Sequence, residues 1–331
     1  MARSAFRTMA FAMTTRILPL TDASARDTAL RCLRDGGLVA LPTETVYGLA
    51  ADATSGVAVA RIFEAKGRPS FNPLIAHVAD IAMARRIALF DPLAERLAAL
   101  FWPGPLTLVL PATEGSPVHP LVQAGLPTIA VRMPRGPAQD ILRALDRPLA
   151  APSANPSGRV SPTSADQVLR GLDGRIDLIL DGGPSALGLE STILKPEEGR
   201  ILLLRPGALT AEDIIAATGI AMAAPGEVIE APGQMRSHYA PAGRVRLNVT
   251  SVEPGEYLIA FGPHPLAGEP KAGDVVNLSK GGDLREAAAN LFGALARFDS
   301  PRIDRVAVAT IPMHGLGAAI NDRLTRAAAP R

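Results

Sequence analysis

Cationic and hydroxyl side chains follow short apolar segments in the stretch 38–77. Each apolar segment has the pattern of a strand or helix that stops at a proline or glycine, and polar residues come directly after it. These polar residues are Thr43, Glu44, Thr45, Tyr47, Lys66, Arg68 and His77. Cations and hydroxyl groups that meet at the ends of several elements suit an anionic ligand.

Each of these residues also has an ordinary structural interpretation. Lys66 and Arg68 end a helical pattern over 57–65, where they would complement the C-terminal end of the helix dipole. His77 follows the apolar run 74–76, where a histidine is more often a satisfied core residue than a ligand contact. Only the combination of these residue types in this order favours a binding site.

A further cation is predicted near the exit of the strand 128–133, which alternates between apolar and polar residues. Arg132 lies on the same face of this predicted strand as Thr128 and Ala130. An arginine in this place is either an ordinary surface residue or a planar fork that binds a carboxylate.

A loop rich in serine, asparagine, proline and glycine follows the short predicted strand 149–151. It spans 152–158, with Ser161 shortly beyond it. Such a cluster is normally just a connection between elements. Directly after a buried strand, however, its hydroxyl and amide groups can also bind phosphate.

The composition describes a globular protein long enough for two domains. The 331 residues are 47% hydrophobic and 20% charged, and the net charge is +2. This charge gives no support for nucleic-acid binding over the whole surface, so any basic site must be local. No GxxxxGK[ST], HExxH, GxSxG or CxxC motif occurs, which removes the common nucleotide-loop, zinc-protease, serine-hydrolase and redox interpretations.

The single cysteine, Cys32, excludes an internal disulfide and fits a reducing cytoplasm. No apolar stretch is long enough to span a bilayer, so we expect no membrane association and a cytoplasmic protein. The first 21 residues contain arginines but no acid, as a transit peptide would. We favour a start at Met13 over a transit peptide, because a well-formed TTRILPL segment follows it.

Seven segments resemble, in order, the signature of the YrdC-like domain of threonylcarbamoyl-AMP synthases. They are PTETVYGL, KGRPSFNPL ending in His77, WPGPLT, SANPSG, DGG, ESTI and LLRPG. The later HYAP segment at 238–241 and the closing GLGAAINDRLTRAA resemble the long form of the family, which has a second domain. The resemblance runs from about Ile17 to the C-terminus.

Strands mixed with helices predict an α/β fold, and the resemblance implies a YrdC-like twisted mixed sheet with helices. A smaller C-terminal Rossmann-like α/β domain is predicted from strands at 244–249, 257–261 and 305–311. We therefore expect an N-terminal extension at 1–16, a catalytic domain at 17–218, a linker at 219–243 and a second domain at 244–331. In the long form of the family, the linker lies over the nucleotide pocket.

The resemblance implies the synthesis of threonylcarbamoyl-AMP and pyrophosphate from L-threonine, bicarbonate or CO₂, and ATP, for threonylcarbamoylation of tRNA. It assigns L-threonine to Thr43, His77, Thr128, Arg132, Ala151 and Ser191. It assigns ATP to Lys66, Arg68, Asn72, Ser153, Asn155, Ser161, Arg205 and Tyr239. Within these sets, Arg132 faces the threonine carboxylate, while Lys66 and Arg68 are the catalytic cations.

Mg²⁺ is expected to arrive with ATP, held by few protein ligands, and no residue is predicted to form a metal site. No residue is nominated as a general base. Glu44 is the nearest candidate, but a capping or structural role fits it equally well. A contact with tRNA or with a tRNA-modifying enzyme is a further expectation.

Two alternatives stay open. The first is a double-stranded RNA-binding module without catalysis, against which the modest charge and the lack of interleaved basic and aromatic motifs argue. The second is the YrdC-like carbamoyltransferase of hydrogenase maturation, which shares the core motifs. This chain lacks the cysteine-rich zinc segments that accompany that domain, and its HYAP linker belongs to the synthase form.

Overall fold

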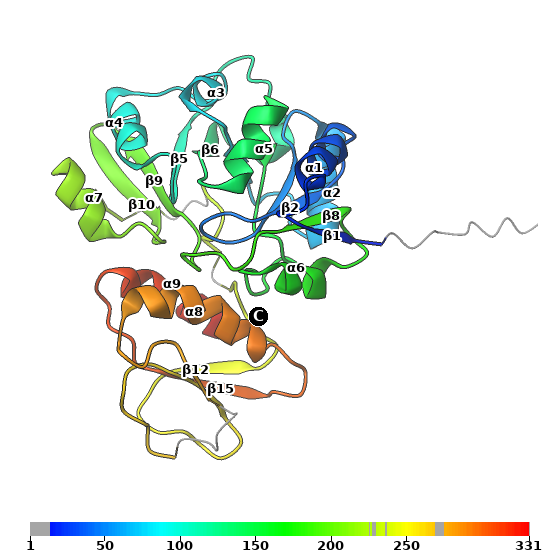
Figure 1. The fold of residues 1–331 in the computed structure, drawn as a ribbon. Coiled ribbons are helices and arrows are strands. Elements are labelled where there is room, and N and C mark those ends of the chain that lie inside the picture. Colours follow the sequence, from blue (N-terminus) through cyan, green and yellow to red (C-terminus); the bar gives the residue numbers. More distant parts are fainter. Residues whose placement is uncertain (1–13, 225, 227–229, 236, 269–274, 331) are drawn as a thin grey trace, which may run out of the picture.

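The computed structural model describes residues 14–224, 226, 230–235, 237–268 and 275–330. Most of the predicted extension at 1–16 lies outside these residues. Figure 1 shows a larger unit built from the first two thirds of the chain and a smaller unit built from the last third. No helix in the part of the chain just defined is long and apolar enough to cross a membrane.

The larger unit is organised around a mixed sheet that has 11 strands among the described residues, in the order β1-β8-β2-β3-β7-β4-β6-β5-β9-β10-β11. The strands are β1 Arg16–Pro19, β2 Val39–Leu41, β3 Gly48–Asp52, β4 Ile75–His77, β5 Leu106–Pro111, β6 Thr128–Arg132, β7 Leu149–Ala150, β8 Leu178–Asp181, β9 Thr192–Glu197, β10 Arg200–Arg205 and β11 Met222–Ala223. The expected mixed sheet is therefore confirmed.

Helices surround this sheet (Figure 1). They are α1 Ala25–Arg34, α2 Gly56–Lys66, α3 Ile81–Arg85, α4 Pro92–Phe101, α5 Pro137–Leu145, α6 Ala165–Leu172 and α7 Ala211–Thr218, with a 3₁₀ turn at Pro120–Val122. Helix α2 shows how local sequence sets the bounds. The Ser55 side chain accepts a hydrogen bond from the Ala58 amide at its start, and Gly67 adopts the left-handed conformation at its end.

Four of these elements differ from the sequence-based predictions. Strand β3 was not predicted, because its sequence GLAAD has weak strand propensity and is buried on both faces, so it does not alternate. Helices α6 and α7 were also missed, although Ser164 and Thr210 cap them through their side chains. Strand β11 lies within the segment 219–243 that we expected to be a linker, and it pairs in parallel with β10.

The smaller unit contains, within the described residues, four parallel strands in the order β12-β15-β13-β14. They are β12 Arg244–Val249, β13 Tyr257–Ala260, β14 Val275–Asn277 and β15 Arg305–Ala309. Helices α8 Leu284–Arg297 and α9 Leu316–Ala328 complete the expected Rossmann-like α/β arrangement. Strand β14 was not predicted from the sequence.

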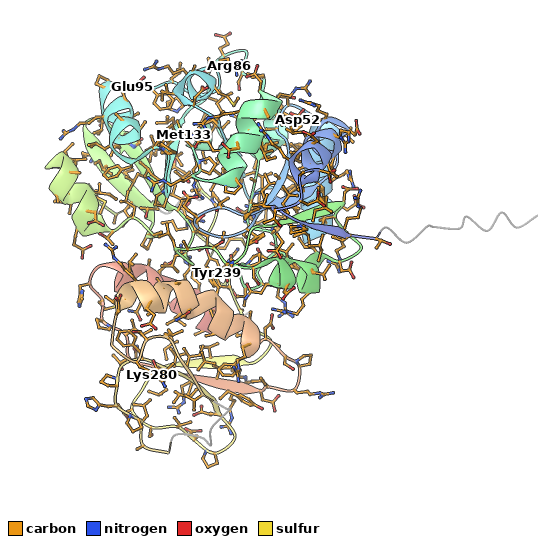
Figure 2. All side chains as sticks on the ribbon, viewed as in Figure 1. Asp52, Arg86, Glu95, Met133, Tyr239 and Lys280 are labelled. Atoms are coloured by element: carbon orange, nitrogen blue, oxygen red, sulfur yellow. The ribbon has the colours of Figure 1, made fainter. Side chains whose placement is uncertain are left out.

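Helices α8 and α9 lie between the smaller sheet and the larger unit (Figure 1). Their apolar faces share one core cluster with Val46, Val160 and Leu189 of the larger unit and with Tyr239 of the connecting segment. The two units are therefore packed against each other through a common apolar core, and Tyr239 lies in the boundary between them (Figure 2).

Candidate active site

The strand ends of the larger unit meet the connecting segment around one cavity with a volume of about 50 Å³. Its wall is formed by Thr43, Thr45, Val46, Gly48, Arg68, Ile75, His77, Arg132, Ala151, Pro152, Ser153, Glu190, Ser191, Arg205, Pro232, Gly233, His238 and Tyr239. Strand register explains part of this convergence. Strands β4 and β6 run in parallel with His77 opposite Arg132, so both side chains reach the same edge of the sheet.

Most residues that the sequence analysis assigned to ligands line this cavity. They are Thr43, Arg68, His77, Arg132, Ala151, Ser153, Ser191, Arg205 and Tyr239. Five assigned residues are not part of the wall, namely Lys66, Asn72, Thr128, Asn155 and Ser161. The particular ligand of each residue stays a prediction.

Thr128 lies at the far end of its strand from Arg132. It pairs with Pro111 at the start of β6, whereas Arg132 pairs with Thr107 at the end. Alternation along a strand places both side chains on one face, but a strand advances about 3.3 Å per residue, so four residues separate them by roughly 13 Å. Sharing a face therefore did not bring Thr128 to the cavity.

Lys66 points into the loop at 153–158. Its buried Nζ donates to the backbone carbonyls of Ser153 and Asn155. Burial lowers the pKa of Lys66 well below its ordinary value, and the nearby Arg68 guanidinium lowers it further. In this structure Lys66 thus shapes the loop that carries Ser153 and does not face the cavity.

Asn72 acts on Arg68 in a similar way. The Arg68 Nη2 donates to Asn72 Oδ1 at 2.7 Å and to the Pro73 carbonyl at 2.7 Å. Burial lowers the pKa of Arg68 to about 10 despite an opposing effect of Tyr239. Asn72 therefore fixes the direction in which this guanidinium enters the cavity wall.

Arg132 forms a buried ion pair with Glu44. The distance between Arg132 Nη2 and Glu44 Oε1 is 2.8 Å, and Arg132 Nε donates to the Gly104 carbonyl at 3.2 Å. Beside it, burial lowers the pKa of His77 well below its usual range, and the charge of Arg132 adds to this effect. His77 is therefore a neutral imidazole next to a fixed cation.

Ser191 and Arg205 hold a second part of the cavity wall together. The Ser191 Oγ and Thr107 Oγ1 lie 2.7 Å apart, and Arg205 Nη2 donates to the Ser191 carbonyl at 2.9 Å. Arg205 Nη1 also donates to the Pro232 carbonyl at 3.3 Å. Arg205 thus joins the sheet to the connecting segment.

The connecting segment is held over the cavity by unusual backbone geometry. Gly233 has a φ of +87°, and a Cβ there would lie 2.8 Å from Arg205 Cδ. Tyr239 has a φ of 62°, although it is not a glycine, and its side chain is buried. Its ring lies 5.5 Å from the Phe292 ring and 5.1 Å from the Arg323 guanidinium carbon, so both helices of the smaller unit hold it.

Glu190 is a cavity residue that the sequence analysis did not select. Its Oε1 accepts a hydrogen bond from Ser161 Oγ at 2.6 Å, and its Oε2 accepts one from Arg323 Nε at 2.8 Å. Burial alone would raise its pKa, but Arg323, Arg205 and Ser161 together lower it to about 2. Glu190 is the first residue of the ESTI segment of the family signature. It was not selected because an acidic side chain was not expected in a site for anionic ligands.

The fold and the cavity thus define a two-unit α/β protein with an arginine-lined cavity where the strand ends meet the connecting segment. Two family models match the chain, one described as telomere recombination over residues 31–207 and one described as threonylcarbamoyl-AMP synthase, C-terminal domain, over residues 209–329.

Two threonylcarbamoyl-AMP synthases and one solved structure resemble the chain along most of its length. A threonylcarbamoyl-AMP synthase of Bacillus subtilis is 41% identical and covers 92% of each chain. One of Pyrococcus abyssi is also 41% identical, covering 90% of this chain and 92% of that protein. The crystal structure of P. abyssi Sua5 complexed with L-threonine has a TM-score of 0.83 at 38% identity and covers 96% of this chain and 97% of that one. The chain belongs to the family of two-domain, Sua5-type threonylcarbamoyl-AMP synthases.

Proposed function

We propose that this protein is an L-threonylcarbamoyladenylate synthase, which makes threonylcarbamoyl-AMP and pyrophosphate from L-threonine, bicarbonate or CO₂, and ATP. The observation that carries the proposal is the cavity, where Arg68, Arg132 and Arg205 meet hydroxyl groups from separate strand ends. The threonine carboxylate, bicarbonate and the triphosphate carry negative charges that repel one another in water. A wall of fixed cations and hydrogen-bond donors holds them together and screens this repulsion.

The chemistry proceeds in two steps. The threonine amine attacks the carbon of CO₂ and loses a proton as the carbamate forms. With bicarbonate, this proton leaves together with the departing hydroxide as water. A carbamate oxygen then attacks the α-phosphorus of ATP, and the bond to the bridging oxygen of the β-phosphate breaks to release pyrophosphate. Neither step needs a covalent intermediate on the protein, so positioning and charge stabilisation supply most of the rate.

In this proposal the threonine carboxylate binds Arg132. Its guanidinium has five N–H donors, so it can bind a second carboxylate while it keeps Glu44 and the Gly104 carbonyl. The neutral His77 and the Thr43 and Ser191 hydroxyls surround the rest of the amino acid. Glu44 is bound to Arg132, which favours its role as a support of that arginine over a role as general base.

The triphosphate lies along Arg68, Ser153 and Arg205, with Tyr239 of the connecting segment against the nucleotide. Lys66 supports the phosphates through the loop whose carbonyls it holds. Among the residues that the structure describes, no three His, Cys, Asp or Glu side chains gather as a metal site. We propose that Mg²⁺ would arrive with ATP, held by few protein ligands, and that it would supply charge neutralisation at the phosphates.

The product is proposed to serve threonylcarbamoylation of a tRNA adenosine in the cytoplasm, after transfer to a tRNA-modifying enzyme. An acyl-adenylate is prone to hydrolysis, which favours its formation in a cavity lined by buried side chains. The wall of this cavity combines buried residues of the sheet with Gly233 and Tyr239 of the connecting segment.

Pyrophosphate release tests the proposal. We expect release from ATP to require L-threonine and bicarbonate together, and we expect ATP and threonine together to raise the unfolding temperature more than either alone. Release that does not depend on threonine would contradict the synthase. Salt-sensitive binding of duplex RNA without protection by ATP or threonine would favour the RNA-binding module, and ATP-dependent use of carbamoyl phosphate would favour the hydrogenase-maturation transferase.

A further inference from the structure

Glu190 places a carboxylate in a cavity that otherwise attracts anions. In the described wall it is the one acidic side chain beside Arg68, Arg132 and Arg205. It is buried, with 6% of its surface exposed, so water does little to screen its charge. A nucleoside triphosphate in the cavity would meet this charge at close range.

The smaller unit supplies the cation that neutralises it. Arg323 of α9 is fully buried, and its Nε lies 2.8 Å from Glu190 Oε2. Its Nη2 donates to the Pro206 carbonyl at 2.9 Å, and its Nη1 binds Asp322. Its guanidinium also lies over the Tyr239 ring at 5.1 Å. Arg323 therefore contacts the cavity wall and the connecting segment at the same time.

Other charged and titratable groups near Glu190 do not replace Arg323. Arg205 is close enough to lower the pKa of Glu190, but its hydrogen bonds go to Ser191 and Pro232. Burial holds the pKa of the nearby His238 at about 3, so its imidazole is neutral, and burial raises the pKa of the nearby Tyr239. Among the described residues, Arg323 is thus the cation that binds Glu190 directly.

We propose that Arg323 is a positioning residue for the nucleotide: by pairing with Glu190 it keeps the cavity cationic, and it completes the ATP site only when the smaller unit is docked. The inference rests on the proposed function, since it takes a nucleoside triphosphate as the ligand. It also gives the smaller unit a direct role in ATP binding. Glu190 in turn orients Ser161, so loss of Arg323 frees a buried carboxylate and loosens the cavity wall.

The same helix offers a matched control. The N-terminal end of α9 is capped from the larger unit, because the Gly315 amide donates to Glu212 Oε1 at 2.9 Å. Glu212→Gln weakens a charged contact between the units without touching the cavity wall. Arg323→Met removes the charge but keeps an unbranched side chain, and Glu190→Gln/Arg323→Met makes both partners neutral.

ATP affinity is measured by calorimetry at pH 7.5 for the full chain and these variants. We expect Arg323→Met to weaken ATP binding by about tenfold or more, because it leaves an uncompensated buried charge. The double variant should bind ATP within about threefold of the unaltered chain, since neither charge remains. Glu212→Gln should bind ATP as the unaltered chain does. In steady-state kinetics, Arg323→Met should raise KM for ATP more than KM for threonine.

The pH dependence separates neutralisation from a purely structural role. In Arg323→Met, ATP binding should recover as the pH falls from 8 to 5.5 relative to the unaltered chain, because Glu190 without its partner takes up a proton more readily. The protonation of ATP itself is common to both proteins. Normal ATP binding by a folded Arg323→Met variant would overturn the inference. If Arg323→Met does not fold, the double variant provides the test, and weak ATP binding by a folded double variant would also overturn the inference. Absence of ATP binding by the unaltered chain would overturn the proposed function first.

Discussion

Glu44 and Arg132 form a buried ion pair at the cavity edge, with 2.8 Å between Oε1 and Nη2. Glu44 follows the strand β2 and Arg132 ends β6, so the pair joins two segments of the sheet that are far apart in the sequence. The pair fixes the guanidinium before any substrate arrives. The Arg132 guanidinium therefore loses little conformational entropy when a ligand carboxylate binds to it.

Arg132→Ala should therefore weaken threonine binding far more than ATP binding. Loss of a charge-assisted contact predicts an increase of roughly ten- to hundredfold in KM for threonine, with a change of less than about threefold for ATP. Steady-state measurement of both KM values checks this. Arg143→Ala removes an exposed arginine of α5 and is the matched control. Equal losses for both substrates would refute the assignment of Arg132 to the carboxylate.

Gly233→Ala should displace Arg205. The positive φ at this position alone disfavours alanine by about 1 kcal/mol, and the new Cβ would also collide with the Arg205 side chain. We expect at least a tenfold loss of kcat/KM for ATP, on the order of the loss of one charge-assisted contact.

Gly199→Ala is the control for the backbone effect of that substitution. Gly199 has a φ of +76°, but no atom lies within 4 Å of its added Cβ. Gly199→Ala should lower the free energy of unfolding about as much as the backbone effect of Gly233→Ala does, and it should leave kcat/KM for ATP unchanged. Equal kinetic effects of both substitutions would show that contact with Arg205 is irrelevant.

Lys66→Met should destabilise the protein as well as weaken ATP binding. It would leave the carbonyls of Ser153 and Asn155 without their shared donor, and an unsatisfied buried group costs about 1–3 kcal/mol. Urea unfolding measures the loss. Lys280→Met, at an exposed lysine of the smaller unit (Figure 2), should change the free energy of unfolding very little. An unfolding curve identical to that of the unaltered chain would show that Lys66 does not hold the loop.

The amino-acid sequence predicts the location of the site better than the contacts within it. Strand ends could be read from prolines, glycines and apolar runs, and the parallel pairing of β4 and β6 then brought His77 and Arg132 together as polar residues at one edge. The group that each polar side chain contacts inside the site cannot be predicted from a local sequence pattern. Lys66 and Asn72 turned out to hold backbone carbonyls and a neighbouring side chain, which spacing alone does not reveal.

Long-range pairs were the hardest to anticipate. Glu190 and Arg323 are 133 positions apart and belong to different units, so only the packing of α9 on the larger unit brings them together. Strand β3 was missed for a different reason, because Gly48–Asp52 has weak strand propensity and is kept in the sheet by its neighbours β2 and β7. Tertiary context therefore decided the features that the sequence left open.

Acid should destabilise this protein through its buried histidines. The pKa of His238 falls from 6.5 to about 3 because of burial, and that of His77 is also well below 6.5. Between pH 6.5 and 5 the unfolded chain binds protons that the folded chain does not. The free energy of unfolding is therefore highest above pH 6.5 and falls with decreasing pH by up to about 1.4 kcal/mol per unit for each histidine. Glu190 has a pKa of about 2 in the folded chain and an ordinary value of 4.5, so it adds a further loss of stability mainly below pH 4.5.

The substitution His238→Asn tests this explanation. It should reduce the slope of the free energy of unfolding against pH by roughly half between pH 6 and 5, measured by urea unfolding at several pH values. The exposed His264→Asn is the matched control. If the slope of the unfolding free energy against pH is unchanged in His238→Asn, the His238 imidazole is protonated in the folded protein. This result would contradict the conclusion that His238 is a neutral imidazole beside Tyr239.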